Sequence, residues 1–387
     1  MAFSEIVYKG NCNTWIRGDL LQVVFPSVGC QRCPKCTMCS FGRYNRNCTP
    51  EEAIKILDNA LSVFAKSHKD YSAEEATTYK SKAPGIKLLL GTYGSILDRR
   101  ECDYLGKIFN YLNSQPHVGA ISTIILETHY TTVDISYLSF LRGLLKPNFN
   151  NEIPKVVIEM GLESINEKVQ GVIHKVIDIA EFANTIAALN HASFSTIANV
   201  LFGAPSLSPA DQISDCIATI SWAYCIGVDE FCVFPLNVWE GSPLWTDYVS
   251  GLYQRPSYYG LLCVIDRVTR NALDKISFSW YGDRQLRNPG WNTEQNVLPP
   301  DTGRESLRFW VKIFDLINST KSGEDRVKIV HAAIRCIHTG SLYDTIKERY
   351  DFKNVQPLEI DKIIQNMNCQ IFPFEQTILA EEANKHE

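Results

Sequence analysis

The most reactive side chains of this sequence gather in one short segment. Within residues 29–42, cysteines occur at three-residue intervals, at Cys30, Cys33, Cys36 and Cys39. Thiolates at this density repel one another unless a cation lies among them, which indicates a metal or iron–sulfur site. The apolar run of residues 20–25 comes just before the segment and predicts a buried strand that ends at the site.

Three kinds of site could contain these thiols. A structural zinc site usually joins two cysteine pairs from separated positions, which four cysteines within ten residues fit poorly. A ferredoxin-type run ends in Cys-x3-Cys-Pro and is matched by a second run, and this sequence has neither feature. We favour a 4Fe–4S cluster held by three thiolates, with one iron left to bind a small molecule.

Composition sets broad limits on the function. The chain has 387 residues, a hydrophobic content of 45% and a net charge of −5, values that are ordinary for a globular protein without a broad basic field. The sequence contains no apparent signal peptide and no run as long as a membrane span. Because the thirteen cysteines are odd in number and no export signal is seen, we expect reduced thiols and a cytoplasmic location.

Apolar runs alternate with helical patterns along the chain and provide the framework for the site. Strands are expected at residues 20–25, 86–91, 121–126, 155–160, 194–202 and 229–234, with helical patterns between them. This alternation predicts an α/β fold with a parallel sheet, and six units suffice for a partial (βα)6 TIM-like barrel. The turn-rich stretch from 287 to 303 predicts a boundary between a core, 1–285, and a C-terminal helical extension, 286–387.

Carboxylates occur at the ends of the expected strands. Glu127 ends the third strand, and Glu163 follows the fourth. Glu159 lies within an apolar run, so we expect it to face the barrel interior, where a carboxylate is costly unless it has a partner. Asn199, near the end of the fifth strand, is expected to face the same way. We therefore predict catalytic roles for Glu127 and Glu159.

These features together resemble the radical S-adenosylmethionine (SAM) superfamily, and most closely the branch containing archaeosine-forming lyases and Elp3-like and YhcC-like proteins. The resemblance covers residues 20 to 244. Its motifs are the cysteine segment, Gly94-Ser95 after the second strand, Glu159 to Ser164 at the fourth, and Phe202 to Pro205 at the fifth. Their order at consecutive strand ends is the strongest signal.

The resemblance implies a ligand set and contacts with SAM. Cys36 and Cys39 match the last two cluster ligands, whereas the first is either Cys30 or Cys33, because the spacing departs from the family's Cys-x3-Cys-x2-Cys. Residues implied to contact SAM are Gly94, Ser95, Glu163, Ser164, Gly203 and Phe41.

The activity implied is reductive cleavage of SAM at a 4Fe–4S cluster, which generates a radical that acts on a small-molecule or modified-nucleobase substrate. Such an enzyme needs an electron donor of the flavodoxin or ferredoxin type. No membrane partner is expected, and nucleic acid is not indicated. Two alternatives remain open: transfer of the 3-amino-3-carboxypropyl group of SAM, as in arsinothricin-forming enzymes, and a non-catalytic iron–sulfur or zinc scaffold.

Overall fold

One sheet of eight strands organises the molecule. The computed structural model describes residues 13–17, 20–30, 36–38, 47–67, 86–99, 103–114, 120–148, 151–238, 242–279 and 304–338. The strands are β1 (Asn13–Arg17), β2 (Leu20–Phe25), β3 (Ile86–Thr92), β4 (Ile121–Thr128), β5 (Lys155–Glu163), β6 (Ser195–Phe202), β7 (Glu230–Pro235) and β8 (Ile276–Phe278). They lie side by side in the order in which they occur along the chain.

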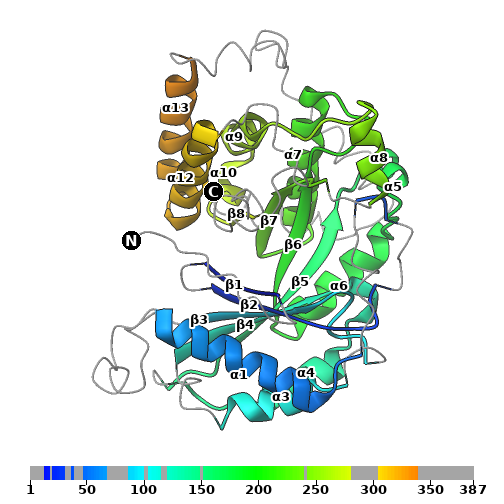
Figure 1. Ribbon diagram of the computed structural model, residues 1–387, viewed down its shortest axis with the longest axis vertical. Helices are drawn as coiled ribbons and strands as arrows, with labels where there is room; N and C mark the ends of the chain where they lie inside the picture. Colours follow the sequence, from blue (N-terminus) through cyan, green and yellow to red (C-terminus); the bar gives the residue numbers. More distant parts are fainter. Residues whose placement is uncertain are drawn as a thin grey trace, which may run out of the picture.

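The sheet is parallel except at its first edge. Strand β1 pairs antiparallel with β2, and every later neighbour from β2 to β8 pairs in parallel. The sheet curls into a half-barrel with helices on its outer side (Figure 1). The predicted α/β partial barrel is thus confirmed. All six predicted strands are present, and β8 adds a seventh parallel strand.

Helices connect the strands and cover the outer face of the sheet. Along the barrel they are α1 (Pro50–Ser67), α3 (Leu105–Leu112), α4 (Ile135–Leu144), α5 (Glu167–Ile173), α6 (Ile179–His191) and α7 (Pro209–Cys225), with a 3-10 turn, η4, at Tyr130–Thr132. After β7 come α8 (Pro243–Val249), α9 (Tyr258–Arg267), α10 (Arg270–Leu273), α12 (Arg304–Ser319) and α13 (Gly323–His338).

Local signals in the sequence explain where several helices begin. The hydroxyl of Thr49 accepts a hydrogen bond from the Glu52 amide at 3.2 Å, as expected for the cap of α1. Asp178 caps α6 and Ser208 caps α7 in the same way. Because these caps satisfy amides at the starts of the helices, they fix where each connection leaves the sheet.

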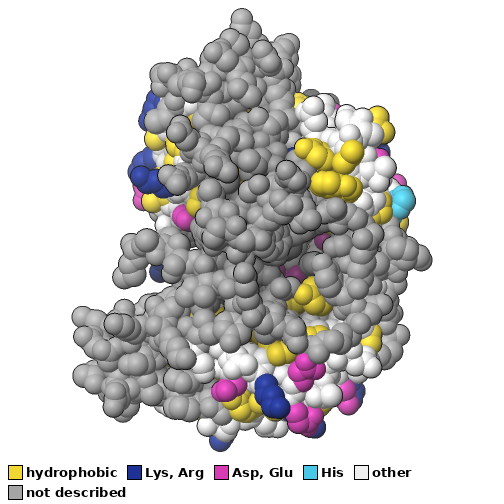
Figure 2. Space-filling view, viewed as in Figure 1, with side chains coloured by type: hydrophobic (Ala, Val, Ile, Leu, Met, Phe, Trp, Pro, Cys, Tyr) yellow, Lys and Arg dark blue, Asp and Glu magenta, His cyan; other side chains and the backbone are white. Residues whose placement is uncertain are grey.

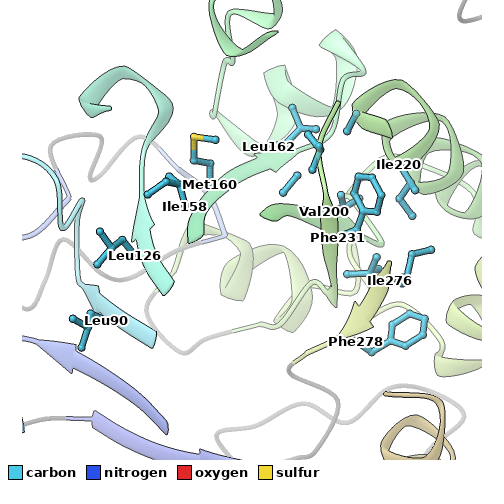
Figure 3. Packing of buried hydrophobic residues seen from close by; sticks show 14 of the residues in the cluster. Leu90, Leu126, Ile158, Met160, Leu162, Val200, Ile220, Phe231, Ile276 and Phe278 are labelled. Carbon is cyan, nitrogen blue, oxygen red and sulfur yellow. The ribbon is translucent and has the colours of Figure 1, made fainter. Parts of the chain in front are cut away.

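The two faces of the sheet carry different side chains. Figure 3 shows Leu90, Leu126 and Ile158 among the buried residues of the large core, which includes residues of α1, α3, α4 and α7. Their immediate neighbours alternate to the opposite, inner face, where Leu89, Ile125 and Val157 form a small separate cluster. The inner face therefore has an apolar layer below the strand ends.

The C-terminal helices pack against the far edge of the sheet. On α12, Trp310 and Phe314 are fully buried, and their rings lie against Tyr258 of α9 and Phe278 of β8. The helical pattern predicted for this part of the chain is confirmed for α12 and α13, which share the main core. The predicted boundary at 285 lies outside the described residues and stays a prediction. Among the described helices, none is long and apolar enough to cross a membrane.

Candidate functional site

Two glutamates lie side by side on the inner face. Glu127 of β4 is directly opposite Glu159 of β5 in the parallel register. Neighbouring strands lie about 4.8 Å apart, and residues in register project to the same face. Gly91 of β3 leaves room for this arrangement, since a Cβ there would lie 2.7 Å from Oε2 of Glu127. The structure thus brings together the two carboxylates predicted to be catalytic.

The environment of this pair disfavours two negative charges. Desolvation by the surrounding protein raises the pKa of Glu127, and the neighbouring carboxylate of Glu159 adds to the rise. Desolvation also raises the pKa of Glu159, which is 7% exposed. Without a bound cation, the pair therefore retains protons at a pH where exposed glutamates are ionised.

Asn199 of β6 extends the pair. Its amide group hydrogen bonds to the Glu159 carboxylate and lowers the pKa that burial raises. Since a carboxylate accepts, the asparagine donates through Nδ2. Its Oδ1 is buried and has no hydrogen-bond partner among the described residues. The inner face thus presents three neighbouring groups of acceptors.

A bulge in β5 places a third glutamate above this pair. The register with β6 shifts between Gly161 and Glu163, and Glu163 has a φ of 62°. This φ turns its side chain back over Gly161, where a Cβ would lie 2.7 Å from Oε1 of Glu163 and 2.5 Å from Nζ of Lys175. A positive φ is strained for a residue other than glycine, and such strain is concentrated at functional sites.

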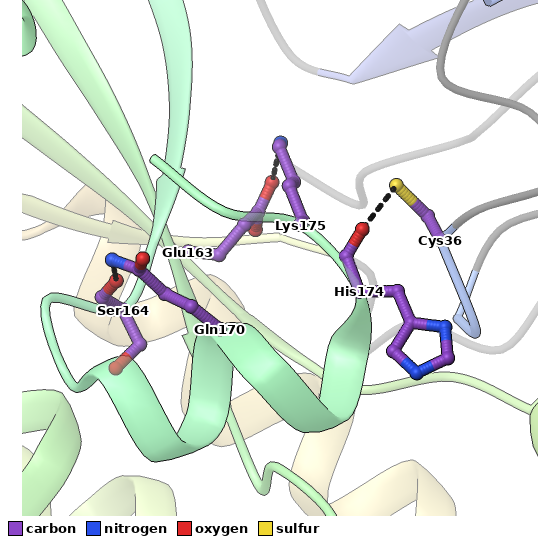
Figure 4. Close-up of polar contacts among 6 residues, drawn as sticks. All are labelled: Cys36, Glu163, Ser164, Gln170, His174 and Lys175. Atoms are coloured by element: carbon purple, nitrogen blue, oxygen red, sulfur yellow. Dashed lines mark hydrogen bonds and ion pairs between the residues drawn. The ribbon is translucent and has the colours of Figure 1, made fainter. Parts of the chain in front are cut away.

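Glu163 forms a buried ion pair with Lys175 (Figure 4). The side chains of Glu163 and Lys175 are 6% and 14% exposed. The pair uses only Oε1, and Oε2 of Glu163 is buried without a hydrogen-bond partner in the described part of the chain. A cation and an unpaired acceptor are therefore adjacent at the end of β5.

The short helix α5 brings Lys175 to this position. Asn166 caps its start by accepting a hydrogen bond from the Lys168 amide, and His174 ends it in the left-handed region. The amide of Lys175 then donates to the Gln170 carbonyl at 3.1 Å. This compact turn directs the chain back toward the sheet.

The cysteine segment is attached to the same helix. The Thr37 amide donates to the Ile173 carbonyl at 3.0 Å, and the thiol of Cys36 lies 3.8 Å from the His174 carbonyl. Met38 packs against an apolar cluster that includes Ile173. Cys36 therefore contacts the residue just before Lys175, the partner of Glu163 (Figure 4). These contacts connect the predicted cluster loop to the strand-end carboxylates.

The other predicted cysteine ligands are only partly described. Cys30 follows β2 as a partly buried free thiol. Cys33 and Cys39 lie outside the described residues, as does Phe41. Within the part of the chain that the structure describes, no group of three metal-ligating side chains is found. The thiol-rich composition of the segment and its position at a strand end suit an iron–sulfur cluster.

The predicted segment after β3 lies next to the end of β4. The Ser95 hydroxyl is 2.5 Å from that of Thr128 and 2.6 Å from that of Thr132. The Gly94 amide donates to the Thr92 hydroxyl at 3.1 Å. These contacts hold the turn against β4. The contact of Gly94 and Ser95 with SAM stays a prediction.

Ser164 and Gly203 have structural partners of their own. The Ser164 hydroxyl donates to Asp215 of α7 at 2.8 Å, which directs it toward the helical layer. Gly203 has a φ of 93°, and a Cβ there would lie 2.3 Å from Pro256, so only glycine fits this turn. Their predicted SAM contacts remain untested, and each residue has a sufficient structural reason to be present.

Sequence reasoning did not identify Lys175. It follows a helix of only seven residues, and nothing in the sequence near it resembles a strand end. Only its contact with Glu163 places Lys175 in the candidate site, and that contact depends on the bulge in β5. The capping asparagine before α5 is the one local signal that the chain folds back there.

The chain is similar to solved structures of known proteins in its fold only. No protein-family model and no curated protein sequence matches the chain. Methylornithine synthase (PylB) has 15% identity and a TM-score of 0.41, covering 86% of this chain and 84% of that one. Elp3 from Methanocaldococcus infernus has 13% identity and a TM-score of 0.40, covering 53% and 50%.

A third similar structure is the radical SAM methyltransferase TsrM from Kitasatospora setae, with 9% identity and a TM-score of 0.40, covering 60% of this chain and 39% of that one. The match thus spans half or less of the Elp3 and TsrM chains. At these scores, a function must be inferred from this chain's own residues. The structural neighbours include radical SAM enzymes, the superfamily that the cysteine segment and the strand-end motifs resemble.

Proposed function

We propose that this protein is a radical SAM enzyme that holds a 4Fe–4S cluster on its cysteine segment and cleaves SAM reductively. When bound, the reduced cluster supplies the electron that breaks a carbon–sulfur bond of SAM. Cys36 is proposed as one of three ligands, with Cys39 and either Cys30 or Cys33 as the others.

The observation that carries this proposal is the contact of Cys36 with the carbonyl of His174, the residue before Lys175, which pairs with Glu163 (Figure 4). SAM has an ammonium and a carboxylate on one carbon. The Glu163 carboxylate matches the first group, and the Lys175 ammonium matches the second. Placed next to the cluster loop, the pair is suited to orient the amino-acid end of SAM.

The proposed substrate is a small molecule. On the face shown in Figure 2, basic and acidic side chains of the described residues lie among one another. The net charge of −5 provides no broad basic field. Binding to nucleic acid would require a basic surface for phosphates. Electron supply from a flavodoxin or ferredoxin and a cytoplasmic location are part of the proposal.

Anaerobic reconstitution tests the proposed function. The protein is treated with iron and sulfide, reduced, and given SAM, and its iron, sulfide and products are quantified. We expect 5′-deoxyadenosine from the unaltered protein. Cys36→Ala should lose most of its iron and all cleavage above background. Cys225→Ala, which removes an exposed thiol at the end of α7, should retain both.

Two other results of this experiment would contradict the proposal. Methylthioadenosine as the sole nucleoside product would favour transfer of the 3-amino-3-carboxypropyl group. A colourless protein that contains zinc and no sulfide would favour a scaffold without catalytic activity.

A further inference from the structure

A buried polar network joins α7 to the segment between β5 and α5. Its central group is the carboxylate of Asp215 on α7, which is 9% exposed. The Ser164 hydroxyl donates to Oδ1 of Asp215 at 2.8 Å, and the side-chain amide of Asn166 also hydrogen bonds to this carboxylate. One turn further along α7, the hydroxyl of Thr219 accepts a hydrogen bond from the Ile165 amide at 3.3 Å. Two side chains of α7 thus hold three consecutive residues after the bulge in β5.

The network continues from Ser164 into α5. Gln170 is 3% exposed, and its Nε2 donates to the Ser164 carbonyl at 2.9 Å (Figure 4). Oε1 of Gln170 accepts a hydrogen bond from the Ile177 amide at 3.2 Å, and its backbone carbonyl accepts one from the Lys175 amide at 3.1 Å. Gln170 therefore connects the chain that leaves α5 to the chain that leaves β5.

The two ends of this network adjoin the two residues of the Glu163–Lys175 pair. Glu163 comes directly before Ser164 and has the strained φ of 62°. Lys175 is held through its backbone amide by the carbonyl of Gln170. A strained residue persists only where its surroundings restrain it. The hydrogen bonds of Ser164 to α7 supply that restraint on one side, and those of Gln170 supply it on the other.

Stability alone does not explain a carboxylate in this position. Neighbouring buried positions of α7 are apolar, among them Ile213 and Ile217. Burial raises the pKa of Asp215 to about 6, and its hydrogen bond with Ser164 acts in the opposite direction. The charged form, which prevails at neutral pH, therefore loses free energy through desolvation and is kept by its donors. A buried polar network whose members are satisfied fixes one geometry of the groups that it joins.

We propose that Asp215 is a positioning residue that keeps the Glu163–Lys175 pair in the arrangement that receives the amino-acid end of SAM. It acts through Ser164 and Gln170 and touches no ligand itself. The identity of the ligand rests on the proposed function, whereas the hydrogen bonds that hold the pair do not. Loss of Asp215 therefore affects the binding of SAM more than the chemical step.

Chemical labelling of lysines tests this positioning without SAM. The full chain is acetylated briefly with an N-hydroxysuccinimide ester at neutral pH, and mass spectrometry gives the rate at Lys175 relative to Lys168, which is exposed on α5. Asp215→Ala should raise this relative rate about tenfold, as expected when a hydrogen bond to a charged group is lost and the segment opens locally. Ser164→Ala should raise it as well, because it removes the same hydrogen bond with a smaller change in volume.

Two further variants separate positioning from a general loosening of the fold. Asp215→Asn keeps an acceptor for the Ser164 hydroxyl and should restore a rate close to that of the unaltered protein. Asp229→Ala is the matched control, because the Asp229 carboxylate accepts a hydrogen bond from the Thr196 amide at 2.9 Å at the opposite end of the sheet. It should leave the rate at Lys175 unchanged. An unchanged rate in both Asp215→Ala and Ser164→Ala, or an equal rise in Asp229→Ala, would overturn the inference.

Cleavage of SAM provides the functional measurement. In the reconstituted protein, Asp215→Ala should raise the KM for SAM about tenfold and change kcat less, and Asp215→Asn should recover most of this loss. An unchanged KM in a variant whose Lys175 reacts faster would also overturn the inference. If the unaltered protein does not cleave SAM but the labelling results hold, the proposed function fails and the positioning of the pair by Asp215 stands.

Discussion

The candidate site contains a buried ion pair, formed by Glu163 and Lys175. Each side chain is mostly buried, and Gly161 is the residue whose missing Cβ leaves space for both. Buried pairs contribute little net stability, but removal of one partner leaves an uncompensated charge. The pair is therefore better explained by binding than by stability.

Lys175→Met should lower the free energy of unfolding by about 3 kcal/mol at neutral pH, because Glu163 then remains buried without its partner. Urea denaturation measures this change. Lys168→Met, on the exposed face of α5, is the control and should change stability little. The double variant Lys175→Met/Glu163→Met should recover part of the loss. A double variant less stable than Lys175→Met would show that the pair itself contributes most of the stability.

At the scale of elements, α12 covers the open edge of the sheet. The backbone amide of Phe278 in β8 donates to Oδ1 of Asn318 at 2.8 Å, and Nδ2 of Asn318 donates to the Phe278 carbonyl at 2.9 Å. One amide side chain thus substitutes for a neighbouring strand. Arg326 of α13 adds hydrogen bonds from its guanidinium to the Leu273 and Ile276 carbonyls. These contacts protect an edge that is prone to pairing with other chains.

Asn318→Leu should destabilise the protein by about 2 kcal/mol, since two partly buried backbone groups lose their partners. Thermal denaturation followed by circular dichroism measures the change, and light scattering should detect more aggregation on heating. Asn184→Ala, on the exposed face of α6, should leave both measurements nearly unchanged. A stable, monodisperse Asn318→Leu variant would contradict this role for the asparagine.

We expect the stability of the whole molecule to depend on pH through three buried carboxyl groups. Burial raises the pKa of Glu127 to about 8, of Glu159 to about 7 and of Asp215 to about 6. The unfolded chain releases these protons near pH 4, so the folded state binds more protons across this interval. Their contribution to stability is therefore complete at low pH and is lost as pH rises through the folded pKa values.

We expect the urea midpoint of the protein prepared without added iron and sulfide to fall between about pH 5 and about pH 8 more steeply than in the Glu127→Gln/Glu159→Gln variant. The comparison isolates the two glutamates, because Asp215 and all other groups titrate in both proteins. Parallel pH profiles would show that the pair does not hold protons in the folded state.

Much of this architecture was readable from the sequence. Apolar runs ending in Phe25, Leu126 and Phe202 marked strands because strands covered on both faces must be apolar along most of their length. Thr49 and Glu52 marked the start of α1 because capping is a local interaction. The cysteine spacing predicted a cluster site for the same reason, since thiolate repulsion acts within one segment, and this site stays a prediction.

Tertiary structure decided which of these residues meet. That Glu127 lies opposite Glu159 follows from the register of β4 on β5, which pairs residues more than thirty positions apart. The partnership of Glu163 with Lys175 depends on a bulge and a left-handed turn that carry no pattern in the sequence. Sequence by itself determined the elements and the reactive residue types, because both arise from short-range chemistry. Only the folded sheet determined their partners, because strand register is set by packing between distant segments.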